Sequence, residues 1–461
     1  MLTHYSGYPA FDLLYDRGGH AIDANVEREA SDFFLTGSGK DITDIIFISH
    51  GWNNDENDAR TALYNPFFTQ FATTTPTFAQ LKNRTFGVLA IFWPSKRFAD
   101  ADLIPGGVAS FTGNEDALLS LQLNRLAEIY DGDPNAASTI AQARTLIAKL
   151  ESSPSAQNDF VALLLSLAPK SRYEIDEGLD AAFDAMSHQN GSDILARLAR
   201  PFAPVVADPG LNFGSGSAAG LAFGTGTASG WLGTAIGGIK NAASSLANLI
   251  TYYTMKDRAG IVGRTGVADF AQSFLDAIAT GTARRRVHLI GHSFGGRLVT
   301  SAANSLRSST SVETMVLLQA AYSHNGLSAD YGGGKPGSFR AVVADRKARH
   351  ILITHSKNDI AVGVAYPLAS RAMNQVADAL VGGPNDLFGG MGRNGAQHTG
   401  EARFDDLLPV GASSGYPPFA DGTWIRNLGG DGDNGKPRIG SHGDVAKPEI
   451  TWAFGQQLAS S

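Results

Sequence analysis

The sequence contains no cysteine among its 461 residues. Disulfide bonds, thiol catalysis and thiolate metal sites are therefore excluded. An excess of positive charge is also absent, because 37 Lys and Arg stand against 44 Asp and Glu, for a formal net charge of −7. Without a strongly basic composition, nucleic acid is a poor partner for this chain.

The first residues lack the pattern of a secretory signal. The sequence begins Met1-Leu2-Thr3-His4, with no basic region followed by an apolar run. A cleaved signal needs both features. We therefore expect a cytoplasmic location, and export by a route without a cleaved signal stays open.

What the sequence does contain is a series of short, continuous apolar runs. The clearest are residues 44–50, 86–92, 287–290, 314–318 and 350–354. Runs that are apolar throughout, rather than at alternate positions, predict strands covered on both faces, as in a mostly parallel sheet. Stretches with helical periodicity lie between them, so we predict an α/β fold with helices on both faces of a central sheet.

One connection in this pattern is far too long. More chain separates the run ending at Phe92 from the run starting at Val287 than a single crossover helix requires. Helical periodicity recurs within it, at residues 115–130, 136–150, 159–167 and 178–198. We therefore predict an inserted helical cap, residues 96–249, between the two parts of the core, residues 1–95 and 250–461.

Residues 209–239 within this insertion carry no charge and are rich in Gly, Ala, Ser and Thr. Two interpretations stay open. The segment is either a flexible or tightly packed loop, or a surface that contacts a membrane, because small residues four apart also occur in membrane helices. Its glycine and hydroxyl content makes it too polar for an ordinary spanning helix.

Two segments match the pattern G-x-S-x-G, around Ser293 and Ser413. In this pattern the serine is a nucleophile on a sharp turn between a strand and a helix, and the glycines allow close backbone approach. Ser293 has a predicted strand before it and a predicted helix, residues 297–306, after it. Ser413 is followed by Tyr416-Pro417-Pro418, which starts such a helix poorly. We predict Ser293 as the nucleophile and a surface loop at Ser413.

A serine hydroxyl needs a base, and the base needs an orienting acid. Where a serine occupies such a turn, the order along the chain is serine, acid, histidine. Asp359 follows a predicted strand, at the end where such sheets gather functional groups, and His442 lies in a late loop before a predicted helix. We predict Asp359 as the acid and His442 as the base. The alternatives are Asp345 and Asp330 for the acid, and His398 and His355 for the base.

Acyl transfer also needs donors for a developing oxyanion, usually backbone amides. One is predicted at Phe294, the residue after the serine, and the other at Trp52, in the turn His50-Gly51-Trp52 after the first strand. The alternative is that this turn merely ends a strand before a capped helix.

Taken together, the His-Gly-Trp turn, the serine motif, the late acid and the late histidine resemble the α/β-hydrolase superfamily. The Trp after His-Gly, followed by Asn53-Asn54-Asp55, resembles poorly characterised bacterial esterase- or lipase-like hydrolases. The resemblance implies an α/β-hydrolase fold and ester hydrolysis through an acyl-enzyme without a cofactor. It implies a small-molecule or lipid ester as the substrate but does not identify which.

Two other functions remain as alternatives. The uncharged segment 209–239 motivates a membrane-acting phospholipase or lipase-type effector, with membrane-surface contact through that segment. A non-enzymatic binding module on a hydrolase scaffold is the second alternative. No metal site is expected: residues 431–435 hint at a calcium loop but lack the later glutamate such a loop requires, so we predict a turn there.

Overall fold

The structure is a computed structural model, and it describes residues 1–95, 115–169, 177, 179–199, 238–281, 285–359, 362, 383–432 and 436–461. The chain divides into two compact units. The sheet unit comprises Met1–Ser95, Arg258–Val362 and Gly390–Ser461, and the helical unit comprises Lys96–Asp257 and Gly363–Gly389.

The helical unit agrees only in part with the predicted cap, residues 96–249. The helical unit starts at Lys96, where the cap was expected to start, but it continues to Asp257 and includes a second stretch, Gly363–Gly389. The expected end at residue 249 falls inside a continuous helix, α10 (Ile239–Val262), because helical periodicity continues through that point. Of the uncharged segment, residues 209–237 lie outside the described residues.

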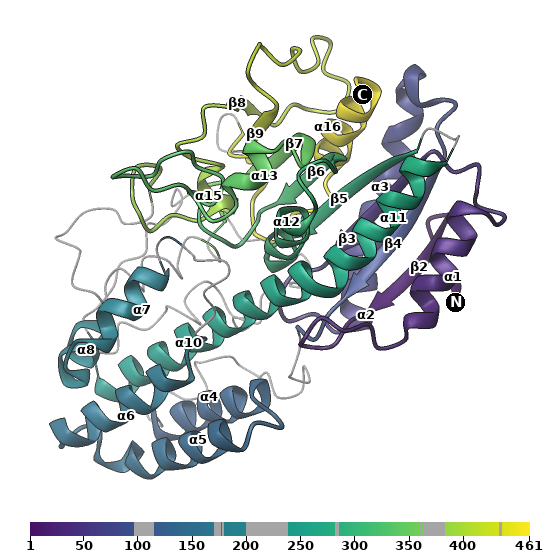
Figure 1. The fold of residues 1–461 in the computed structure, drawn as a ribbon. Coiled ribbons are helices and arrows are strands. Elements are labelled where there is room, and N and C mark those ends of the chain that lie inside the picture. Colours follow the sequence, from purple (N-terminus) through teal and green to yellow (C-terminus); the bar gives the residue numbers. More distant parts are fainter. Residues whose placement is uncertain are drawn as a thin grey trace. The chain divides into compact units, whose positions relative to one another are not determined.

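The sheet unit is built on a sheet that has nine strands within the described residues, in the order β1-β2-β4-β3-β5-β6-β7-β9-β8 (Figure 1). The strands are β1 (Leu2–Tyr5), β2 (Tyr8–Leu14), β3 (Asp44–Ser49), β4 (Phe86–Phe92), β5 (Arg286–His292), β6 (Val312–Leu318), β7 (Ala348–His355), β8 (Ala402–Asp406) and β9 (Ile425–Gly429). Every neighbouring pair is parallel except β1 with β2. The prediction of an α/β fold with a mostly parallel sheet is confirmed.

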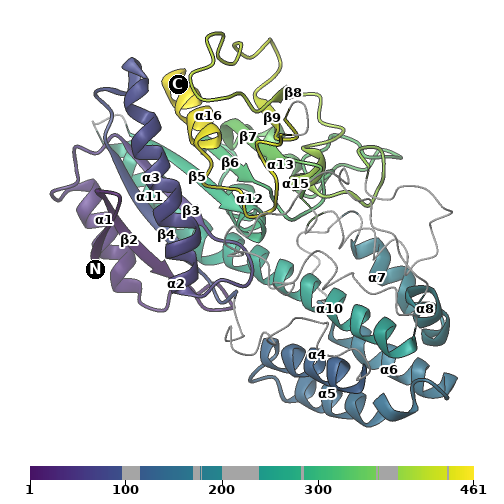
Figure 2. The same ribbon diagram turned by 180° about the vertical axis from the view of Figure 1, so that it is seen from behind.

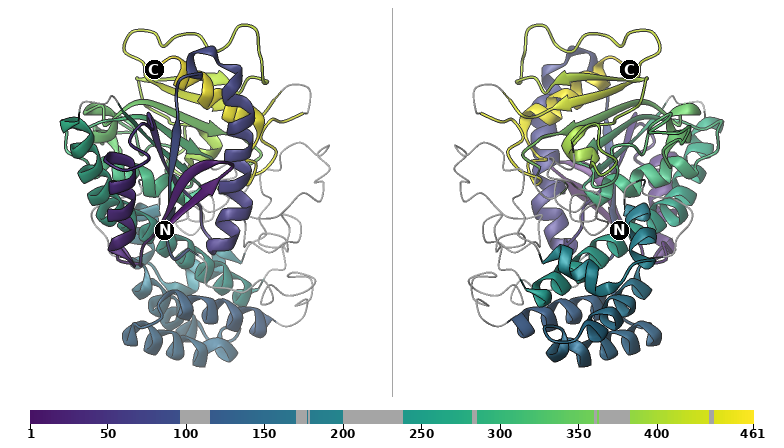
Figure 3. Two further views of the ribbon diagram at one scale, coloured as in Figure 1. Left: turned by 90° about the vertical axis from the view of Figure 1, so that its right-hand side faces the viewer. Right: turned by 90° about the vertical axis from the view of Figure 1, so that its left-hand side faces the viewer.

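Helices cover both faces of this sheet, as Figures 2 and 3 show from further directions. The helices of the sheet unit include α1 (Ala24–Leu35), α2 (Glu56–Asp58), α3 (Asn65–Thr74), α11 (Ala268–Thr280), α12 (Phe294–Ser305), α13 (Arg340–Ala344), α15 (Met391–Asn394) and α16 (Pro448–Ala459). A π-helical turn, Ala59–Tyr64, joins α2 to α3.

The two faces can be followed along β3, in which every residue is buried. Ile46 and Ile48 belong to the cluster that includes Phe71 of α3 and Phe454 of α16. Phe47 points the other way and contacts Phe270 of α11, with ring centroids 5.9 Å apart. Adjacent strand residues point to opposite faces, so a strand that is apolar throughout needs helices on both sides.

The helical unit is described by α4 (Glu115–Ile129), α5 (Pro134–Leu146), α6 (Pro154–Leu167), α7 (Leu179–Ser187), α8 (Gly191–Leu198) and the greater part of α10. Contacts run from α4 to α5, from α5 to α6, and from α6 to α7 and α8. The sequence predicted one helix over residues 178–198, but the chain forms two, separated near Asn190-Gly191. No helix among the described residues is both long enough and apolar enough to cross a membrane.

A buried charged cluster closes the amino-terminal end of the sheet. The Asp44 carboxylate, at the start of β3, is fully buried and accepts hydrogen bonds from Arg84 Nε at 2.9 Å and from His288 Nε2 at 2.9 Å. Arg84 also donates to the Leu458 carbonyl of α16 at 2.5 Å. Burial by itself would raise the pKa of the Asp44 carboxyl, but the hydrogen bonds and charges of Arg84 and His288 hold it well below its usual range.

Replacing Asp44 with asparagine is expected to lower the free energy of unfolding near pH 7 by about 3 kcal/mol, because it leaves the Arg84 side chain, which is only 9% exposed, without its charge partner. A depressed pKa stabilises the fold above the unfolded-state pKa of about 3.9, and that contribution is lost as the pH falls further. The difference between wild type and Asp44→Asn in urea unfolding should therefore be constant from about pH 5 to 8 and shrink below about pH 4. A difference that does not change with pH would contradict this account.

Candidate active site

Ser293 occupies a strained turn between β5 and α12. Its backbone has φ 57° and ψ −122°, a region that residues other than glycine rarely adopt. The Ser293 N–H donates to the Leu318 carbonyl at the end of β6 at 3.0 Å, and the Ser293 carbonyl accepts from the Ala321 N–H at 3.0 Å. The second motif serine, Ser413, is exposed in a loop, as predicted.

The two motif glycines are required by close backbone approach. A Cβ on Gly295 would lie 2.5 Å from the His50 carbonyl oxygen, and one on Gly291 would lie 2.6 Å from the Gly296 nitrogen. No side chain fits at such distances, so α12 packs directly against the ends of β3 and β5 only because both residues are glycine. This packing accounts for the strand-turn-helix arrangement that the motif predicts.

His442 and Asp359 form a buried pair. His442 Nδ1 lies 2.8 Å from Asp359 Oδ2, and their relative exposures are 2% and 0%. The other carboxylate oxygen, Oδ1, accepts the Val362 N–H at 3.0 Å. A carboxylate can only accept, so Nδ1 carries the hydrogen and Nε2 of the neutral ring is left as a proton acceptor.

The loop that carries His442 contacts the turn that carries Ser293. His292, the residue before the serine, donates from Nε2 to the His442 carbonyl at 3.0 Å, and the two rings have centroids 4.9 Å apart. Burial, followed by the charge of His442, lowers the pKa of His292 to about 3. A neutral His292 therefore holds the backbone of the histidine loop against β5.

The predicted oxyanion turn lies beside the serine because β3 and β5 are neighbouring parallel strands, with Ser49 paired to Gly291. A Cβ on Gly51 would lie 2.7 Å from the Ser293 Cβ, so glycine is needed there as well. The rings of Trp52 and Phe294 have centroids 5.9 Å apart. The structure thus brings together the two residues whose amides were predicted as donors.

The alternative acids and bases are exposed or make other contacts. Asp330, Asp345 and His398 are exposed. Asp330 accepts the N–H groups of its own loop, and Asp345 accepts the Ser308 hydroxyl at 3.1 Å. The His355 ring packs against Phe404 at 6.0 Å.

Gln319 is a residue that the sequence analysis did not identify. It follows β6 with φ 40° and donates from Nε2 to the carbonyls of His442 at 3.4 Å and Asp444 at 3.2 Å. Its Oε1 accepts the Thr354 hydroxyl at 2.5 Å. Its position directly after a predicted strand, at the same sheet edge as the other candidates, was the signal available.

Asp431, in the segment whose sequence hints at a calcium loop, contacts the protein chain. Asp431 Oδ1 accepts the Ser356 hydroxyl at 3.0 Å and the Lys357 N–H at 2.7 Å, which ties that loop to the segment carrying Asp359. Residues 433–435 lie outside the described residues. Among the residues that are described, no group of three or more His, Asp or Glu side chains is arranged to hold a metal ion.

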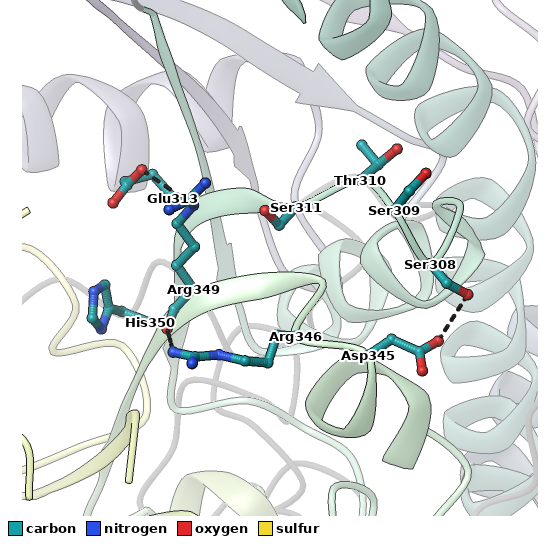
Figure 4. Close-up of a pocket in the computed structure, with 9 residues that line it drawn as sticks. All are labelled: Ser308, Ser309, Thr310, Ser311, Glu313, Asp345, Arg346, Arg349 and His350. Atoms are coloured by element: carbon teal, nitrogen blue, oxygen red, sulfur yellow. Dashed lines mark hydrogen bonds and ion pairs between the residues drawn. The ribbon is translucent and has the colours of Figure 1, made fainter. Parts of the chain in front are cut away.

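A pocket of about 450 Å³ lies near the amino-terminal ends of β6 and β7 (Figure 4). Its lining residues are Ser308, Ser309, Thr310, Ser311, Glu313, Asp345, Arg346, Arg349 and His350. Arg349 Nε lies 3.8 Å from Glu313 Oε2. The pocket includes none of Ser293, Asp359, His442, Trp52 and Phe294; of the alternative acids, Asp345 lines it.

Comparison with known proteins identifies no relative of this chain. No family model, no curated protein and no solved structure matches the chain.

Proposed function

We propose that the protein is a serine hydrolase of the α/β-hydrolase fold that cleaves carboxylic esters through an acyl-enzyme intermediate. The observation that carries the proposal is the buried contact of His442 Nδ1 with Asp359 Oδ2 at 2.8 Å, in a loop bonded to the residue before Ser293. A histidine held by an acid through Nδ1 has Nε2 available for a serine proton.

In the first half of the reaction, Ser293 Oγ attacks the ester carbonyl carbon while His442 Nε2 takes the hydroxyl proton. Asp359 stabilises the imidazolium that results. The carbonyl oxygen becomes an oxyanion, which accepts hydrogen bonds from the Trp52 and Phe294 amides. The tetrahedral intermediate then collapses, the bond to the alkoxy oxygen breaks, and His442 returns its proton to the departing alcohol.

In the second half, water attacks the acyl-enzyme carbonyl and His442 takes a proton from that water. The second tetrahedral intermediate expels Ser293 Oγ, which recovers the proton, and the carboxylic acid leaves. Each proton taken by His442 is returned, so the enzyme ends as it began.

The strand arrangement supports this proposal independently of the side-chain contacts. The proposed nucleophile follows β5, one proposed oxyanion donor follows β3, and Asp359 follows β7. All of these strands are parallel, so their carboxyl ends meet at one edge of the sheet, where open α/β sheets gather their functional groups.

A fluorophosphonate probe tests the proposal directly, because it reacts only with an activated serine. We expect stoichiometric labelling of the purified protein, with the modified residue identified as Ser293 by peptide mass spectrometry. Ser413→Ala, in the second copy of the motif, is the matched control and should label like wild type. Absence of labelling at Ser293 in folded protein would contradict the proposal and favour a binding module.

A panel of aryl esters, triacylglycerols, phospholipid vesicles and amides would identify the substrate class. We expect turnover of a short-chain aryl ester. Strong preference for phospholipid vesicles over soluble esters would instead favour the membrane-acting alternative that the uncharged segment 209–239 suggested.

A further inference from the structure

The peptide bond between Gly51 and Trp52 is held from its carbonyl side by two side chains. His50 Nδ1 lies 2.8 Å from the Gly51 carbonyl oxygen, and Asn54 Nδ2 lies 3.2 Å from the same oxygen. Both residues are buried, at 1% and 7% relative exposure. Rotation of this peptide would break two hydrogen bonds made by buried side chains, and an unsatisfied buried polar group is costly.

The N–H of the same peptide bond belongs to Trp52. In a trans peptide the carbonyl and the N–H point in opposite directions. Holding the Gly51 carbonyl toward His50 and Asn54 therefore turns the Trp52 N–H away from them. Hydrogen bonds accepted by a carbonyl also polarise the amide, so its N–H becomes a stronger donor.

His50 is itself anchored. The Trp93 backbone N–H approaches His50 Nε2 at 3.4 Å, so Nε2 accepts and Nδ1 carries the hydrogen that it donates to Gly51. The His50 ring stacks on the Trp93 indole, with centroids 5.7 Å apart and planes 10° apart. Burial lowers the pKa of His50 to about 4, so the ring is neutral near pH 7.

Asn54 is anchored through its backbone. Its N–H donates to Ser95 Oγ at 3.1 Å, and the Ser95 hydroxyl donates back to the Asn54 carbonyl at 2.8 Å. Its side-chain amide makes a second bond, to the Trp52 carbonyl at 3.0 Å. The amide nitrogen that contacts Gly51 is therefore fixed to the segment after β4 and cannot follow the peptide if it turns.

We propose that Asn54 and His50 are positioning residues for the oxyanion site, which set the Gly51–Trp52 peptide so that the Trp52 N–H is oriented before substrate binds. The inference rests on the proposed function, since the orientation matters only where an oxyanion forms. Neither side chain touches the substrate. They act through one peptide bond and are expected to affect the transition state rather than substrate binding.

Asn54→Ala in the full-length protein tests this. We expect kcat for a short-chain aryl ester to fall about 10- to 100-fold, less than or comparable to the loss of one oxyanion donor, while KM stays within about twofold. The inhibition constant of an alkyl boronic acid, which forms a tetrahedral anionic adduct with a serine hydroxyl, should rise by the same factor as kcat falls.

Asn53→Gly is the matched control. Asn53 lies in the same turn, its Oδ1 has no hydrogen-bond partner among the described residues, and its φ of 59° suits glycine. This variant should keep wild-type kcat and boronic acid affinity. An equal loss in both variants would overturn the proposal, because loosening of the turn would then explain the effect.

A second pair of variants keeps the test decisive if Asn54→Ala does not fold. His50→Asn retains a donor near the position of Nδ1, and His50→Leu removes it at similar size. We expect His50→Asn to have a higher kcat and to bind the boronic acid more tightly than His50→Leu. A lowered melting temperature with unchanged kcat and boronic acid affinity would indicate a purely structural role and overturn the inference alone. Wild-type protein that neither hydrolyses an ester nor binds the boronic acid would overturn the proposed function, and the inference with it.

Discussion

Ser293→Ala is expected to lower kcat for a short-chain aryl ester by about 10⁵-fold or more, because no other group can form the acyl-enzyme. The hydroxyl is the only part of the side chain that is removed. Alanine at φ 57° is strained to the same degree as serine. The backbone bonds from Ser293 to Leu318 and Ala321 do not involve the side chain and remain.

The measurement is single-turnover and steady-state hydrolysis of the aryl ester, with thermal unfolding to establish that the variant folds. Ser413→Ala provides the control, since it removes a hydroxyl from the same motif in an exposed loop. It should retain wild-type kcat. Persistent turnover in folded Ser293→Ala would remove the basis for the proposed mechanism.

Asp359→Asn is expected to lower kcat by about 10⁴-fold, with a smaller change in KM. The asparagine oxygen can still accept the Val362 N–H, so the loop keeps its shape. If its amide nitrogen faces His442 Nδ1, however, that nitrogen is a donor and favours the tautomer with the hydrogen on Nε2. The ring then presents no acceptor to the serine, and no carboxylate stabilises the imidazolium.

The pH dependence of kcat/KM in Asp359→Asn and in wild type, together with direct comparison of kcat, checks this expectation. Asp345→Asn and Asp330→Asn are matched controls, because both acids were candidates from the sequence and both are exposed. They should behave like wild type. Loss of activity in one of these variants, with Asp359→Asn nearly unaffected, would assign the acid elsewhere.

Much of the sheet could be predicted from local sequence alone. The predicted strand at residues 86–92 coincides with β4, and the others match β3, β5, β6 and β7 to within a few residues. These strands are buried on both faces and are therefore apolar throughout. The strands β1, β2 and β8 were not predicted, because edge positions and partly exposed faces tolerate polar residues, as in the β8 sequence Ala402–Asp406. The strand β9 is largely buried, but Arg426 and Asn427 interrupt its apolar run.

In the candidate site, too, local features could be predicted from the sequence and contacts between distant segments could not. Ser293 could be preferred to Ser413 from the sequence, because strand, turn and helix are local features that follow one another along the chain. Asp359 pairs with His442 rather than with His398 or His355, and this pairing is a contact between loops that are distant in the sequence. The roles of His292, Gln319 and Asn54 likewise depend on carbonyl groups brought near by the fold, and a sequence pattern carries no direct record of backbone partners.

By itself the sequence determined the α/β class, the strands that are apolar throughout and the turn that carries Ser293, since each depends on residues close together in the chain. The tertiary structure alone decided the strand order and therefore which loops meet at the carboxyl edge of the sheet. The physical reason is that hydrophobic burial specifies which residues lie inside without specifying their neighbours. Neighbours are selected by packing and by hydrogen bonds between distant segments, such as the close approach of Gly51 to Ser293 and the bond between His442 and Asp359.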